Sequence, residues 1–159
     1  MLITKKHQYA LRAIFELGKR YEQGPIKIAH IAHAQAIPER FLENILAELK
    51  KGGFVKSKRG LNGGYELVPR PDRFLVGDLM RFLTRDLKPV ECMAPVPEAD
   101  CPFQGKCAFF PMWRQVKDAI FKVYDATSIQ DLIDRDEEDG RYPLNGDHPQ
   151  PKQLAAKKV

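Results

Sequence analysis

Three cysteines are the residues of this chain whose type and spacing are best suited to chemistry. Cys92, Cys101 and Cys107 are separated by eight and then by five residues, so all three fall within sixteen positions. Thiolates gathered on one loop suit a soft metal, either zinc or the iron of an iron–sulfur cluster. Their odd number argues against a disulfide framework. We therefore predict a metal site here, with three inert thiols as the alternative.

Three thiolates leave one coordination position of such a metal site to another group. An external thiol or a water molecule could fill it, and the chain itself offers His7, Gln8, His33, Glu91 and Asp100. The sequence leaves this choice open, because each histidine could equally lie on an exposed helix face without binding a metal.

A predicted helix over residues 38–51 comes before the cysteine loop. Its apolar residues recur at helical spacing and form one packing face: Phe41, Leu42, Ile45, Leu46 and Leu49. Pro38 suits the first helical position because its missing N–H would have no partner there, and Gly52 and Gly53 end the helix. The remaining face is polar and consists of Glu39, Arg40, Glu43, Asn44, Glu48 and Lys50.

A short hairpin comes directly after this helix. Residues 54–58 and 65–68 are predicted strands around a six-residue loop, 59–64, that holds three glycines and one asparagine. Such a loop tolerates positive φ angles and lets the backbone approach another surface closely. No helix comes after it, so it is not a phosphate-binding turn. We predict a basic hairpin that carries Lys56, Lys58 and Arg59.

A helix with a polar face joined to a basic hairpin is typical of a winged helix-turn-helix. The helix would enter the major groove of DNA, and the hairpin, or wing, would reach the backbone or the neighbouring minor groove. The alternative is a solvated amphipathic helix with an ordinary surface hairpin after it. The predicted DNA-contacting residues are Pro38, Glu39, Arg40, Glu43, Asn44, Lys56, Lys58, Arg59, Asn62, Gly63 and Gly64.

The charge of the chain is distributed unevenly. Residues 1–90 hold 17 Lys and Arg against 9 Asp and Glu, whereas residues 91–159 hold 9 against 12. The basic excess coincides with the predicted helix and wing, as expected where a protein must neutralise phosphates.

The composition predicts one soluble domain with attachments. The chain is 43% hydrophobic and 30% charged, and no apolar run approaches the roughly 20 residues of a membrane helix. The N-terminus lacks the apolar region of a signal peptide, so we expect a cytoplasmic protein without a membrane partner. The periodicity predicts a mainly α-helical fold with four parts: a winged helix-turn-helix domain (1–85), a cysteine loop (86–107), two C-terminal helices (108–135) and a disordered tail (136–159).

A long C-terminal helix is predicted directly after the third cysteine, over residues 108–127. Its apolar positions form one seam, at Trp113, Val116, Ile120, Val123 and Tyr124. Such a seam would serve a dimer interface built from paired helices, and the alternative is that it packs on its own domain. A last short helix, 129–134, is predicted behind a capping box of Ser128 and Asp131.

Together these segments resemble the winged-helix iron–sulfur regulators typified by IscR, NsrR and RirA. The resemblance covers the chain from Met1 to about residue 134 and rests on four features. These are Leu2-Ile3-Thr4-Lys5 with Tyr9-Ala10-Leu11, then Phe41-Leu42-Glu43, then the wing, and finally three cysteines before Trp113-Arg114. The wing, Val55-Lys56-Ser57-Lys58-Arg59-Gly60 to Gly63-Gly64-Tyr65, is the most specific match.

The resemblance implies a homodimer that binds palindromic promoter DNA and senses iron, cluster supply, nitric oxide or oxidants. The sensor would be a 2Fe–2S or 4Fe–4S cluster held by Cys92, Cys101 and Cys107. Base reading would fall to Arg40, Glu43 and Asn44, and Arg59 with the wing glycines would meet the minor groove.

Two positions depart from the family pattern. Phe110 stands where IscR-like chains have a histidine ligand, and Gln8 stands where NsrR-like chains have an aspartate. The first interval between cysteines is also eight residues here, against five in IscR-like chains. The resemblance therefore leaves the fourth ligand and the cluster type open.

The expected function is that of a DNA-binding transcriptional repressor that responds to the state of its cluster. One alternative is a regulator of the same fold without a cluster, which senses zinc or thiol oxidation or receives its signal from a partner protein. Another is a small iron–sulfur electron carrier, which would leave the basic wing unexplained. We do not expect an enzyme, because nothing in the sequence pairs a nucleophile with a base.

Overall fold

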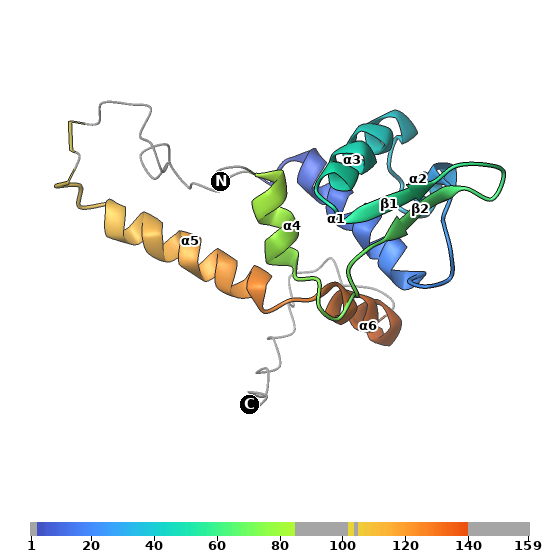
Figure 1. Cartoon of the computed structure of the whole chain (residues 1–159). Coiled ribbons are helices and arrows are strands. Elements are labelled where there is room, and N and C mark those ends of the chain that lie inside the picture. The colour runs from blue at the N-terminus through green and yellow to red at the C-terminus, as the bar shows by residue number, and fades with distance from the viewer. Residues whose placement is uncertain (1–2, 85–101, 104, 140–159) are drawn as a thin grey trace.

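The computed structural model describes residues 3–84, 102–103 and 105–139, and it is mainly helical with one antiparallel hairpin (Figure 1). The elements in chain order are α1 (Lys5–Lys19), α2 (Ile28–Ala34), α3 (Glu39–Lys51), β1 (Val55–Lys58), β2 (Gly64–Leu67), α4 (Val76–Leu83), α5 (Phe110–Asp125) and α6 (Ile129–Asp139). This order confirms the predicted helix-turn-helix with a wing after it. Pro38 is the residue that precedes the first turn of α3, one position earlier than predicted.

Helix α1 is the centre of the body, because it contacts α2, α3, α4, α6 and β2. Ala10, Ala13, Ile14 and Leu17 recur at helical spacing on one face of α1, and all four are buried. The inner face of α3, which includes Leu46 and Leu49, packs against them. Each fully buried leucine contributes about 1.5–3 kcal/mol of hydrophobic stabilisation. This core fixes the orientation of α3 and leaves its polar face outside.

The wing is attached to the core through its second strand. Strands β1 and β2 pair in register from Val55 opposite Leu67 to Lys58 opposite Gly64. The backbones of Ile26 and Tyr65 exchange two hydrogen bonds of 2.9 Å, which join the α1–α2 connection to β2. A Cβ on Gly64 would lie 2.3 Å from the carbonyl oxygen of Ile26, so only glycine permits this approach. The base of the wing is therefore held rigidly to the body.

Helix α6 returns to the body and lies against α1. Ile129 and Ile133 are buried, and Gly18 of α1 gives Ile129 the space to approach. The predicted capping box is present: the Asp131 N–H donates to Ser128 Oγ at 3.0 Å, and the Ser128 N–H donates to Asp131 Oδ2 at 2.8 Å.

The predicted end of this last helix at residue 134, with disorder from residue 136, was wrong for residues 136–139. Helix α6 continues to Asp139, and Lys19 Nζ pairs with Asp136 Oδ2 at 2.9 Å, which ties the added turn to α1. A tertiary contact of this kind leaves no trace in local periodicity. The rest of the predicted tail, 140–159, lies outside the described residues.

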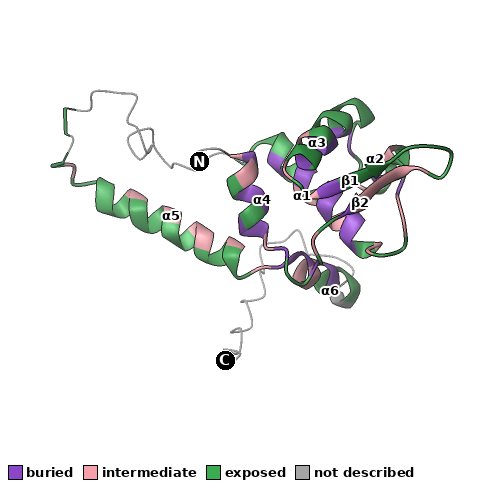
Figure 2. Cartoon of the chain, viewed as in Figure 1, coloured by how far each residue is buried: buried purple, intermediate pink, exposed green. Residues whose placement is uncertain are grey.

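Helix α5 extends away from the body on the side opposite to the wing (Figure 1). None of its sixteen residues is buried, and Figure 2 shows only exposed and intermediate positions along it. It meets the body at α4, near its own C-terminal end. In the part of the chain that the structure describes, no helix is long and apolar enough to cross a membrane.

Candidate nucleic-acid interface

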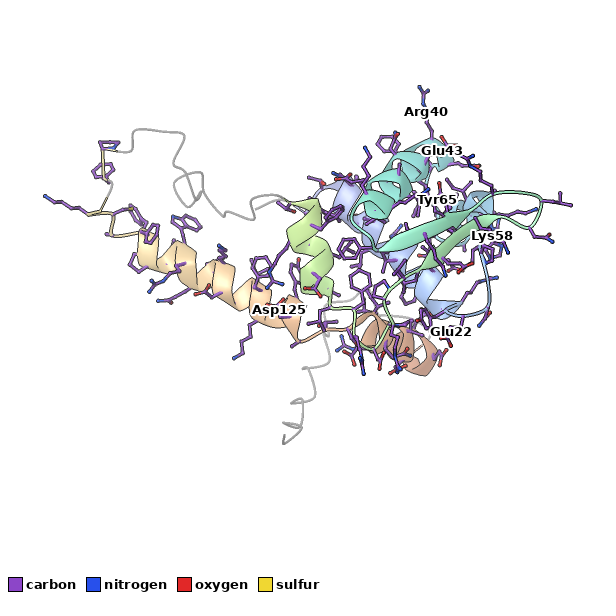
Figure 3. All side chains as sticks on the ribbon, viewed as in Figure 1. Glu22, Arg40, Glu43, Lys58, Tyr65 and Asp125 are labelled. Atoms are coloured by element: carbon purple, nitrogen blue, oxygen red, sulfur yellow. The ribbon has the colours of Figure 1, made fainter. Side chains whose placement is uncertain are left out.

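The polar face of α3 is open to solvent, as predicted. Arg40, Glu43 and Asn44 are all exposed, and in Figure 3 the Arg40 side chain points outward, away from the body. They lie on this face because Leu42, Ile45, Leu46 and Leu49 occupy the opposite one. Their hydrogen-bonding groups are those that read base edges: guanidinium to guanine, amide to adenine and carboxylate to the cytosine amino group.

The basic residues of the wing differ in how free their charges are. Lys56 Nζ lies 2.8 Å from Glu66 Oε2 across the hairpin, and this hydrogen bond raises the pKa of Lys56. Lys58 and Arg59 are exposed and form no ion pair with any residue that the structure describes. Lys50 Nζ at the end of α3 donates to Ser57 Oγ at 2.6 Å and links α3 to the wing. The unpaired charge of the wing is therefore concentrated toward its tip, at Lys58 and Arg59.

The tip of the wing is a tight turn that depends on glycine. The Gly63 N–H donates to the Gly60 carbonyl at 2.9 Å, which leaves Leu61 and Asn62 as the two central residues of the turn. Gly60 has φ +107°, and a Cβ on Gly63 would lie 2.3 Å from the Lys58 carbonyl oxygen. The sequence predicted the glycines and Asn62 at this site but not Leu61, whose side chain the turn holds in solvent.

A buried carboxylate positions the helix-turn-helix, and no sequence pattern indicated it. Glu16 of α1 is 5% exposed and accepts a hydrogen bond of 2.9 Å from the Gln35 side chain. Its other oxygen lies 3.4 Å from Arg20 Nε and 3.9 Å from His30 Nε2. A buried charge with such partners is costly to disturb, so this network holds α2 against α1.

The cysteine site lies mostly beyond the residues that the structure describes. Cys107 is a half-buried free thiol in the turn before α5, where its carbonyl accepts from the Phe110 N–H at 3.3 Å. Cys92 and Cys101, with Glu91 and Asp100, lie outside the described residues. Among the described residues no three His, Cys, Asp or Glu side chains are grouped to hold a metal. Thiolates are nevertheless the ligand type that zinc and iron–sulfur clusters take, and the three cysteines would supply three of four ligands.

The candidate fourth ligands on the described helices differ in their surroundings. Gln8 and His33 are exposed, but His7 is only 8% exposed, so it does not lie on an open helix face. Its Nδ1 contacts Thr4 Oγ1 at 2.7 Å and accepts from the Thr4 N–H, while Nε2 contacts Thr84 Oγ1 at 2.5 Å. Burial, with Lys6 nearby, lowers the pKa of His7. Both ring nitrogens are thus engaged, and the ring joins the start of α1 to the end of α4.

The predicted seam on α5 is only partly used within this chain. Val116 and Val123 are 39% and 63% exposed. Trp113 and Ile120 are half-buried, whereas Tyr124 packs against the core and burial raises its pKa. Among the described residues, the alternative that the helix packs on its own domain applies only to its C-terminal end.

These features define a winged helix-turn-helix protein with a protruding C-terminal helix. The chain belongs to the Rrf2 family, which is described as iron-dependent transcriptional regulators. The family model matches residues 3–135. The predicted family and fold class are confirmed. Because the family consists of transcriptional regulators, the protein is a DNA-binding regulator and not an enzyme.

Individual relatives agree with this assignment. CymR of Bacillus subtilis is 34% identical over 132 residues, which cover 83% of this chain and 89% of CymR. NsrR of Geobacillus kaustophilus is 33% identical, and the match covers 84% of this chain and 90% of NsrR. The structure of B. subtilis CymR, described as the global cysteine regulator, has a TM-score of 0.67 over 84% of this chain and 97% of CymR. The structure of IscR from T. potens has a TM-score of 0.68 and is 29% identical, and the match covers 89% of this chain and 92% of that IscR.

Proposed function

We propose that the protein is a homodimeric repressor that binds palindromic promoter DNA and responds to an iron–sulfur cluster. Each protomer would place α3 in the major groove and its wing on the adjacent backbone and minor groove. The observation that supports this most is the pairing of an exposed polar face on α3 with unpaired Lys58 and Arg59 on a hairpin held to the same core. Family membership supports the DNA-binding role independently.

Specific reading of bases is assigned to α3. Arg40 and Asn44 can each form bidentate hydrogen bonds to a base edge, worth about 1–3 kcal/mol of discrimination per contact. Glu43 accepts from cytosine but repels phosphate, so it contributes selectivity rather than affinity. The wing supplies positive charge that positions the protein without reading sequence in the major groove.

Dimerisation is assigned to the open side of α5. When a partner covers exposed apolar surface, the association is stabilised by about 25 cal/mol for each Å² removed from water. The exposed residues on and before this helix include Phe109, Met112, Val116 and Val123. A second copy of α5 would cover the same seam on both protomers, which is the symmetry that a palindromic site requires.

The cluster is assigned to Cys92, Cys101 and Cys107, with the fourth ligand open. Bound there, an iron–sulfur cluster would provide a group whose presence depends on iron supply and which nitric oxide or oxidants destroy. Cys107 lies three residues before the start of α5 at Phe110, and α4 ends at Leu83, so the cysteine loop joins these two helices in sequence. Ligation by Cys107 would restrain the start of α5, and its loss would change how two protomers sit on DNA.

A second candidate is a regulator of the same fold that responds through its thiols or through zinc. The similarity to CymR, described as the global cysteine regulator, and the free thiol of Cys107 favour it. An electron carrier would leave membership of the Rrf2 family unexplained.

The test uses full-length protein purified without oxygen, in both redox conditions, and a pool of randomised duplexes. We expect selection of a palindrome, binding that weakens with salt, and iron with acid-labile sulfide in the wild type. Arg40→Ala should lose about 1–3 kcal/mol of discrimination at one base pair of each half-site, whereas the exposed Lys122→Ala on α5 should not. Failure to enrich any duplex in either condition would refute the proposal, and zinc in place of iron would favour the second candidate.

A further inference from the structure

Leu61 is the most exposed large apolar side chain among the described residues, at 88%. It occupies a central position of the turn at the wing tip, between Gly60 and Gly63. Val68, at 48%, lies at the base of the hairpin, and Phe41, at 60%, still packs edge-on against Tyr9 with ring centroids 6.4 Å apart. Leu61 gains almost no burial within its own chain, so its presence there is not explained by the stability of the fold.

The turn presents Leu61 between two side chains that donate hydrogen bonds. Arg59 comes before Gly60, and Asn62 is the other central residue of the turn. Both are exposed, and Arg59 has no acidic partner among the residues that the structure describes. The wing tip therefore combines an apolar projection with flanking donors. This combination matches the minor groove of A·T-rich DNA, whose floor carries acceptors only.

We propose that Leu61 enters the minor groove beside each half-site and excludes base pairs that place a guanine amino group there. This inference rests on the proposed DNA-binding function and adds a specificity-determining residue to it. Apolar side chains, leucine among them, are inserted into the minor groove by many proteins that bind there. Leu61 would be the contact that makes the wing selective, whereas Arg59 contributes mainly charge.

The discrimination arises from the chemistry of the groove floor. The 2-amino group of guanine projects into the minor groove and is a hydrogen-bond donor. Leu61 has no acceptor, so its contact would strip water from that donor and leave it unpaired, which is costly. Adenine N3 and thymine O2 add no such projection, and as acceptors they can pair with the amide donor of Asn62.

The test is a purine-analogue exchange in a duplex selected from the randomised pool by wild-type protein. At the A·T pairs that the wing protects, 2,6-diaminopurine replaces adenine and adds the minor-groove amino group while leaving the major groove unchanged. We expect this exchange to weaken wild-type binding by about tenfold, within the usual range for one unfavourable base pair. Inosine in place of guanine at a substituted G·C pair should restore the binding.

Three variants identify the side chain responsible. Leu61→Ser should bind the selected duplex and its 2,6-diaminopurine analogue with affinities within about twofold of each other, because the apolar side chain is gone. Leu61→Met, which keeps an apolar side chain of similar reach, should retain most of the discrimination. Arg59→Ala should lower affinity for both duplexes and keep their ratio. Thermal unfolding should be the same in all of these variants, since neither side chain is buried.

Each outcome is decisive. Loss of the analogue effect in Leu61→Ser with retention in Leu61→Met supports the assignment. An analogue effect that is absent in the wild type, or unchanged in Leu61→Ser, overturns it while the proposed function still holds. If the wild type enriches no duplex at all, the proposed function fails and this inference fails with it.

Discussion

The winged body and helix α5 differ in what surrounds their apolar residues. In the body, the apolar residues on the inner faces of α1 and α3 are buried against other elements of the same chain, except Phe41, which is 60% exposed although it was predicted on the packing face of α3. In α5, an equally regular apolar seam has no buried residue along its sixteen positions (Figure 2). The same periodicity therefore predicts a helix in both places but not the surface against which the helix packs.

The joint between these two regions is narrow and specific. Arg81 of α4 donates to Asp125 of α5 at 2.5 Å and lies over the ring of Phe121, 4.5 Å from its centroid. A Cβ on Gly77 would lie 1.9 Å from Asp125 Oδ1. The far end of α5 has no such contacts among the described residues and begins at Phe110, three residues after Cys107. In the proposed dimer, a helix anchored at one end and joined to the cysteine loop at the other would transmit a change at those cysteines to the second protomer.

The largest effect should come from the body. Leu46→Ala removes a completely buried side chain from α3 and should lower the free energy of unfolding by about 2–5 kcal/mol, through lost burial and the cavity that remains. The exposed Glu43→Ala on the same helix should change it by less than about 0.5 kcal/mol. Urea unfolding at fixed protein concentration measures both. Equal effects would mean that α3 is not packed as described.

A smaller effect is expected at the joint. Gly77→Ala places a methyl group against Asp125 Oδ1, so this exposed carboxylate must rotate away and weaken its ion pair with Arg81, which should destabilise the protein by no more than about 1 kcal/mol. Asp125→Ala should lower the free energy of unfolding less in the Gly77→Ala background than in the wild type, because in that background it also removes the overlap with the new methyl group. A double-mutant cycle by urea unfolding checks this. Strict additivity of the two changes would contradict the contact.

The wing should affect DNA binding without affecting folding. Arg59→Ala removes one exposed, unpaired charge and should lower the slope of log K against log salt by about 0.9, the value for one phosphate contact on duplex DNA. Lys56→Ala should change the slope less, because its charge is already paired with Glu66. Fluorescence anisotropy over a salt series measures both slopes. Equal changes would show that the ion pair opens on DNA.

The smallest effect should be a pH dependence that arises from His7. Burial lowers its pKa in the folded state below the ordinary value of 6.5, so the unfolded chain takes up the proton first as the pH falls. Stability should therefore be full above about pH 6.5 and decline below it. His7→Gln should remove this part of the decline, as monitored by urea unfolding between about pH 5 and 8. A variant with an unchanged pH profile would assign the decline to other groups.

The sequence predicted most of the features that depend on local pattern. The apolar spacing of 38–51 and the glycines of the wing were sufficient for α3 and the hairpin, because both depend on neighbours in sequence. The buried Glu16 network, the contact between His7 and Thr84 and the extra turn of α6 were missed, since each joins residues distant in sequence. Leu61 was missed for another reason: an apolar residue in a polar turn gives no periodic signal.

The role of α5 in dimerisation is tested by the mass of full-length protein in solution after a charge is placed on the seam. Val116→Asp puts a carboxylate on the open seam, whereas Gln115→Asp puts the same group on the same helix but away from the seam. In analytical ultracentrifugation we expect dimers for the wild type and Gln115→Asp, and monomers with an unchanged far-ultraviolet spectrum for Val116→Asp. A wild-type monomer, or a Val116→Asp variant that stays dimeric, would contradict the claim that α5 is completed by a second copy of the chain.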